Sequence, residues 1–181
     1  SLGGVVTMVM AKMYPERVAG ALLNDIGPEL DQKGLDRIAD HVGQGRSFDT
    51  WAHAGRDMAE NSADIFPDFT LKDWIEFAKK VYRMNSSGRI KLDYDMKIAE
   101  PFDSKGGGSG ALWNALENMQ DIPTLILRGE LSDLFSEQVA RKMLDKLDKG
   151  ELVTIPRVGH APTLEEPASL DAINQLLHRI D

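Results

Sequence analysis

The stretch IPTLILRGE, residues 122–130, is the clearest strand signal in the sequence. It is a continuous apolar run without polar alternation, which is typical of a strand covered on both faces of a parallel sheet. An amphipathic helix over 136–148, a second strand over 151–155 and a closing helix over 169–180 follow it. This order of strand, helix, strand and helix predicts parallel pairing with right-handed crossovers. The fold class is therefore expected to be α/β.

The chain before this region contains a helix, a strand and a long helical segment. Small and apolar residues at helical spacing over 2–14 predict a helix that ends before Pro15. Residues 18–26 read as a short apolar strand that breaks at Gly27-Pro28. Residues 29–100 differ, because they hold amphipathic stretches expected to be helices, at 30–43, 47–61 and 70–84. This region is predicted to be a helical layer inserted into the α/β core.

Composition limits the possible partners. The 181 residues carry a net charge of −8 without a Lys/Arg-rich run, so neither nucleic acid nor an anionic membrane surface is expected as a partner. The absence of cysteine excludes disulfides, thiolate metal sites and cysteine nucleophiles in this chain. We expect a cytoplasmic protein, because such a composition fits a reducing compartment. The histidines lack the spacing of metal-binding pairs, and no apolar run approaches the ~18 residues of a membrane span.

Three residues could carry chemistry together: Ser1, Asp133 and His160. Asp133 follows the strand at 122–130, His160 follows the next strand, and Ser1 precedes a helix. Reactive groups collect at the carboxyl ends of strands in an open α/β sheet. A hydroxyl, an imidazole and a carboxylate brought together there can form a catalytic triad. For the carboxylate, Asp25 at the end of the strand 18–26 is a second choice, and Glu130 is another.

The motifs around these residues resemble those of the α/β-hydrolase fold. SLGG at 1–4 resembles the second half of a nucleophile elbow, G-x-S-x-G, with Gly3 as the closing glycine. PTLILRGELSD at 123–133 resembles the strand and turn that bear the acid, and VGHAPTLEEP at 158–167 resembles the histidine loop. The order Ser, Asp, His is the order of that family. The 27 residues between Asp133 and His160 leave room for one helix and one strand.

The resemblance implies an architecture. It is a mostly parallel sheet flanked by helices, with an inserted α-helical cap and with the N-terminal strands of the parent fold absent from this chain. Residues 1–28 would form the elbow helix and following strand, 29–105 the cap, and 106–181 the C-terminal part of the core. The chain would then begin within the elbow motif. The Gly-rich stretch at 105–110 is expected to be a hinge between cap and core, since it lacks the pattern of a phosphate-binding loop.

The resemblance also implies an activity. Ser1 would attack a carbonyl carbon, His160 would act as base and then acid, Asp133 would orient His160, and the backbone N–H of Leu2 would line the oxyanion hole. The substrate would be a small molecule with a carboxylester, lactone or activated C–C bond, and no cofactor or metal would be needed. Apolar cap residues could line the substrate pocket: Phe48, Trp51, Met58 and Trp74. Each of them could equally pack the cap together.

Two other hypotheses remain open from the sequence. The chain could be a catalytically inactive fragment or an interaction-only α/β module with an incomplete oxyanion hole. In that case an unpaired sheet edge would favour a homo-oligomer or a complementing N-terminal segment as partner. An N-terminal-nucleophile hydrolase, with the α-amine of Ser1 as base, is a further reading. That class is built from antiparallel sheets, which the pattern over 122–180 does not favour.

Overall fold

A computed structural model describes residues 1–103 and 109–180 of the chain. It divides into two compact units, Ser1–Asp36 with Gly107–Asp181, and Arg37–Gly106. The first boundary between the units lies after Asp36, whereas the sequence led us to expect it after residue 28. The expected boundary after residue 105, and most of the hinge expected at 105–110, fall outside the described residues.

The first unit contains a parallel sheet. Its described strands are β1 (Ala21–Asn24), β5 (Thr124–Gly129) and β6 (Gly150–Ile155), in the order β1-β5-β6. Leu22 is in register with Leu125, and Leu125 with Glu151. Every residue of the central strand β5 is buried, as its continuous apolar sequence predicts. The predicted α/β fold class is confirmed, and the parallel pairing is not that of an N-terminal-nucleophile hydrolase.

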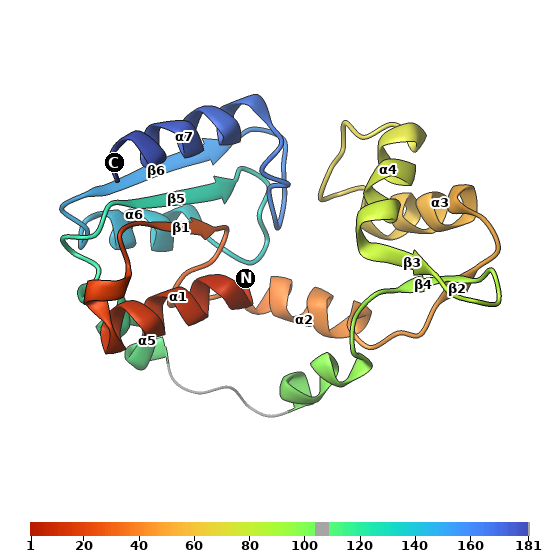
Figure 1. Cartoon of the computed structure of the whole chain (residues 1–181), viewed down its shortest axis with the longest axis horizontal. Coiled ribbons are helices and arrows are strands. Elements are labelled where there is room, and N and C mark those ends of the chain that lie inside the picture. The colour runs from red at the N-terminus through yellow and green to blue at the C-terminus, as the bar shows by residue number, and fades with distance from the viewer. Residues whose placement is uncertain (104–108, 181) are drawn as a thin grey trace. The chain divides into compact units, whose positions relative to one another are not determined.

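Helices cover both faces of this sheet (Figure 1). The elements are α1 (Leu2–Met13), the 3₁₀ turn η1 (Pro15–Arg17), α5 (Ser109–Glu117), α6 (Glu137–Leu144) and α7 (Pro167–His178). α6 and α7 both contact β5 and β6, whereas α1 contacts β1 and α5. Figure 1 shows α7 and α1 on opposite sides of the sheet.

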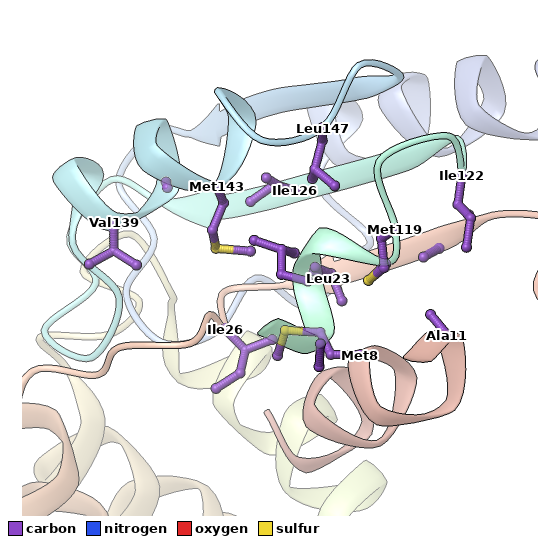
Figure 2. Close-up of a cluster of buried hydrophobic side chains, with 14 of the residues drawn as sticks. Met8, Ala11, Leu23, Ile26, Met119, Ile122, Ile126, Val139, Met143 and Leu147 are labelled. Atoms are coloured by element: carbon purple, nitrogen blue, oxygen red, sulfur yellow. The ribbon is translucent and has the colours of Figure 1, made fainter. Parts of the chain in front are cut away.

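The core of the first unit lies where α1, α5 and α6 meet the sheet. Figure 2 shows Met8 of α1, Leu23 of β1, Ile126 of β5 and Met143 of α6 directed toward one another. All of them are essentially inaccessible to solvent. Burying side chains of this kind contributes about 1.5–3 kcal/mol each, relative to leaving them exposed. The core therefore holds the ends of β1 and β5, which bear polar residues described below, at fixed positions.

The second unit is helical with a small sheet. α2 (Gln32–His41) runs across the division between the units; α3 (Trp51–Ser62), α4 (Leu71–Val81) and the 3₁₀ helix η2 (Met96–Asp103) follow along the chain. An antiparallel sheet with described strands β2 (Ser47–Phe48), β4 (Ile90–Leu92) and β3 (Tyr82–Met84) lies in the same unit. The sequence predicted only helices here. These strands are too short for an alternating pattern to be recognised, and the third expected helix ends at Val81 instead of 84.

Candidate active site

A hydrogen-bonded chain of side chains joins Ser1, His160 and Asp25. The Ser1 hydroxyl lies 2.6 Å from Nε2 of His160, and Nδ1 of His160 lies 2.7 Å from Oδ2 of Asp25. Because the carboxylate accepts, Nδ1 carries the ring proton, which leaves Nε2 to accept from the serine hydroxyl. The imidazole is therefore held in the tautomer that can remove a proton from Ser1.

The carboxylate in this chain is not the one expected first from the sequence. The described hydrogen bonds of the His160 ring go to Ser1 and Asp25, and the expected role of Asp133 as the acid stays a prediction. Asp25, the second choice, occupies that position. The physical reason is that β1 and β5 are neighbours in a parallel sheet. Their carboxyl ends therefore lie side by side, and either could present an acid to the same histidine.

Asp25 is fully buried and held by donors on β5 and the turn after it. Its Oδ1 accepts a hydrogen bond of 2.7 Å from the Gly129 backbone N–H, and its Oδ2 accepts one of 2.6 Å from the Ser132 hydroxyl. These donors offset the cost of burying a carboxylate. The backbone of Asp25 has a φ of 54°, a left-handed conformation that costs about 1–3 kcal/mol outside glycine. The packing around it maintains this strained geometry.

The loop that carries His160 is attached to both neighbouring strands. Asn24, the last residue of β1, donates from Nδ2 to the carbonyl of Pro162 at 2.9 Å. At the end of β5, a Cβ on Gly129 would meet the backbone carbonyl of Gly159 far inside van der Waals contact. Only glycine allows the loop and the strand to approach this closely. The imidazole position is thus determined by backbone packing on β1 and β5.

Glu130 shapes the same turn. Its carboxylate accepts a hydrogen bond of 2.7 Å from the backbone N–H of Arg157, a residue with a φ of 56°. Glu130 is exposed and lies on the turn, and the described hydrogen bonds of the His160 ring go elsewhere. The alternative that Glu130 is the acid partner of His160 is therefore wrong.

The hydroxyl of Ser1 lies at the N-terminus of α1. The Ser1 carbonyl accepts from the backbone N–H of Gly4 at 3.0 Å, so Ser1 is the N-cap residue. The next residue, Leu2, has a backbone N–H that helix geometry leaves without an intrahelical acceptor, at the positive end of the helix dipole. Among the described residues, a Cβ on Gly3 would meet nothing within 4 Å, whereas one on Gly4 would overlap Ile26. Close packing among the described residues therefore requires glycine at position 4, and the role of Gly3 as the closing glycine of the elbow stays a prediction.

The apolar residues expected in the substrate pocket all lie in the second unit. Trp74 is buried in a cluster of aromatic rings with Phe66, Phe69 and Phe77. Phe48, Trp51 and Met58 pack around Ala54, Ala78, Tyr82 and Ile90. Met58 also lines a cavity of about 200 Å³ within that unit, together with the Arg46–Asp57 ion pair. Contact of these residues with a substrate stays a prediction.

The described part of the chain shows neither a metal-ligand cluster nor a membrane span. Residues 1–103 and 109–180 contain no group of three or more His, Asp or Glu side chains placed to hold a metal ion. Within the same residues, no helix has both the length and the apolar character to cross a membrane. The candidate site consists of a hydroxyl, an imidazole and a carboxylate, which are joined by hydrogen bonds along which a proton can move.

Residues 1–172 match the model of the alpha/beta hydrolase family. The chain belongs to this family. The resemblance found in the sequence is thereby confirmed, and the parallel sheet with flanking helices is the corresponding portion of the alpha/beta hydrolase fold.

Solved and curated relatives agree with this assignment. This alpha/beta hydrolase is 49% identical to an alpha/beta hydrolase from Novosphingobium aromaticivorans, with a TM-score of 0.89, covering 99% of this chain and 63% of the other. It is 26% identical to a putative hydrolase from Rickettsia typhi, with a TM-score of 0.81, covering 99% and 60%. A 3-hydroxybutyrate-oligomer hydrolase from Cupriavidus necator is 30% identical over 178 residues, 94% of this chain and 60% of the relative. The chain spans about three fifths of the length of these relatives.

Proposed function

We propose that the protein is a serine hydrolase in which Ser1 is the nucleophile, His160 the general base and Asp25 the acid that orients it. The observation that carries the proposal is the hydrogen-bonded chain from Ser1 through His160 to Asp25. Its distances of 2.6 and 2.7 Å lie within the range in which a base can take a proton from a nucleophile.

The geometry supports the following steps. The Ser1 oxygen attacks a carbonyl carbon while its proton passes to Nε2 of His160. The new imidazolium is stabilised by Asp25, which accepts from Nδ1 throughout. The oxyanion receives a hydrogen bond from the Leu2 backbone N–H at the start of α1. Nε2 then donates its proton to the leaving group, and water releases the acyl group by the same route in reverse.

The proposed substrate is a small molecule with a carboxylic ester bond. The relative from Cupriavidus necator, 30% identical, is named for hydrolysis of 3-hydroxybutyrate oligomers, which are joined by ester bonds between short hydroxyacids. Lactones contain the same reacting group, and an activated C–C bond would use the same nucleophile. We therefore expect turnover of short hydroxyacyl esters before that of lactones or C–C substrates.

Labelling with a fluorophosphonate probe tests the nucleophile. The wild-type protein should become covalently labelled at Ser1, and both Ser1→Ala and His160→Ala should abolish labelling, because one removes the nucleophile and the other the base. Ser86→Ala is the matched control, since Ser86 is exposed on a turn of the second unit. It should label at the wild-type rate.

A panel of p-nitrophenyl esters and the 3-hydroxybutyrate dimer tests the reaction. Hydrolysis with an acyl-enzyme intermediate on Ser1, detected by mass spectrometry, is the expected result. A wild-type protein that is folded but neither labels nor turns over any ester would contradict the proposal and favour an interaction-only module. Labelling that persists in Ser1→Ala would contradict the assignment of the nucleophile.

A further inference from the structure

Ser132 lies in the turn after β5 and contacts the proposed acid. Its hydroxyl lies 2.6 Å from Oδ2 of Asp25. The same oxygen accepts hydrogen bonds from the backbone N–H groups of Phe135 at 3.1 Å and Leu134 at 3.3 Å. A serine hydroxyl has one proton. Because the backbone groups are donors, that proton is directed at the carboxylate.

This arrangement fixes the direction of the Ser132 hydroxyl. The turn from Ser132 to Phe135 holds the oxygen in place through backbone donors, and Phe135 is itself completely buried. The Ser132 backbone N–H also bonds to the Gly129 carbonyl at 3.0 Å. The donor is therefore pre-oriented by its own turn, and is not a surface hydroxyl that rotates freely.

The effect on Asp25 is to prevent rotation of its carboxylate. Gly129 N–H holds Oδ1 at 2.7 Å, while Ser132 and His160 both bond to Oδ2. Without Ser132, Oδ2, the oxygen that accepts the hydrogen bond from Nδ1 of His160, would lose its other donor. The carboxyl plane could then turn about its Cβ–Cγ bond, and the ring of His160 would turn with it.

We infer that Ser132 is a positioning residue, which acts on the proposed reaction through Asp25 and fixes the orientation of His160. The inference rests on the proposed function of the Ser1, His160 and Asp25 chain. Loss of the hydroxyl should lower kcat by about 10- to 100-fold, the effect of removing one hydrogen bond to a charged group. KM should stay within about twofold, because Ser132 does not touch the substrate in this proposal.

The test compares Ser132→Ala with Ser132→Thr and Ser136→Ala. Threonine retains the hydroxyl and should restore kcat to within about threefold of wild type. Ser136 lies four residues further along and caps α6 by accepting from the backbone N–H of Val139. Its replacement should lower the melting temperature while kcat stays within about twofold. A purely structural role of Ser132 would instead make Ser132→Ala resemble Ser136→Ala.

A second measurement separates this inference from the proposed function. Proton NMR of the wild-type protein should show a downfield resonance for the His160 Nδ1 proton, which Ser132→Ala should shift or broaden and Ser136→Ala should leave unchanged. This readout does not need turnover, so it tests Ser132 even if no substrate is hydrolysed. An unchanged resonance in Ser132→Ala, or kcat within twofold of wild type in that variant, would overturn the inference.

Discussion

The carboxylate of Asp25 accepts hydrogen bonds from three donors. Its replacement by an amide tests the proposed role of Asp25 as the acid. In Asp25→Asn, the side chain cannot accept from Gly129, Ser132 and His160 together without placing an NH₂ group against one of these donors. The imidazole would lose its tautomer and its charge partner. We expect kcat to fall by on the order of 10⁴, as when the acid of a serine protease triad is made an amide. Steady-state kinetics on a p-nitrophenyl ester measures this.

Asp133→Asn is the matched control for this prediction. It makes the same chemical change at Asp133, the carboxylate that the sequence favoured. Asp133 follows Ser132 in the turn after β5. We expect it to retain most of the wild-type kcat. The reverse pattern, with Asp133→Asn inactive and Asp25→Asn active, would show that the acid is Asp133 after all.

At this scale the sequence predicts part of the site. The motifs S-L-G-G and G-H-A-P single out Ser1 and His160, which lie within hydrogen-bond distance of each other, because such motifs depend on local chain geometry. The choice between Asp25 and Asp133 depends on which carboxylate faces the His160 ring, and the orientation of a side chain in the folded protein cannot be read from local sequence. The contact of Ser132 is missed for the same reason: the motif GELSD resembles the turn that bears the acid and so favours its aspartate, whereas the serine before it donates to the carboxylate of Asp25.

Among the elements, the start of α7 gives a prediction about pH. Glu166 accepts hydrogen bonds from the Thr163 backbone N–H and hydroxyl at 2.8 Å and from the Ser169 hydroxyl at 2.7 Å. Burial acts to raise the pKa of Glu166, but these hydrogen bonds outweigh it, and the pKa lies below its usual value of 4.5. Folding therefore favours the ionised form, so its contribution to stability is present above pH 4.5 and is lost as pH falls below the native pKa.

Glu166→Gln should remove this contribution. The melting temperature of the variant should be lower than that of wild type at pH 7, and the difference should shrink as the pH is taken from 5 toward 3. Thermal unfolding followed by circular dichroism measures both. An equal difference at pH 7 and pH 3 would show that ionisation of Glu166 does not stabilise the start of α7.

The elements themselves follow the sequence where their patterns are long. β5 is recognised from its apolar run, and α6 from its amphipathic spacing with the Ser136 cap, although α6 ends at Leu144 and not at the expected residue 148. The sheet of the second unit is not recognised from the sequence. Its strands β2, β3 and β4 are two or three residues long, and they form only by pairing with one another. α7 begins at Pro167, before the expected residue 169, since proline is well tolerated in the first turn of a helix.

For the whole molecule, burial predicts which strand is the last to unfold locally. β5 is buried along its entire length between two parallel partners, whereas the three residues of β4, the central described strand of the second unit, are in turn buried, exposed and half-buried. Amide hydrogen exchange followed by mass spectrometry should find the slowest exchange in peptides covering β5. Peptides covering β4 should exchange faster. Equal rates in the two strands would contradict this order of stability.

The division into units was only partly predictable. The sequence shows a change of character after residue 28, where amphipathic helices replace apolar segments, but the structural division comes after Asp36. The first residues of α2 belong with the first unit because Gly34 lies directly against the backbone of Leu134, where a Cβ would come within 2.6 Å of its Cα. A contact between residues one hundred positions apart leaves no local signal.

Gly129 has a consequence for the redesign of this protein. Because Gly129 has no side chain, the Gly159 carbonyl of the His160 loop can lie against it. Its backbone N–H donates to the carboxylate of Asp25. The same residue therefore allows the loop to approach and helps to orient Asp25. Directed evolution that randomises the end of β5 should return glycine at 129 almost without exception. Diversity intended to change selectivity is better introduced elsewhere.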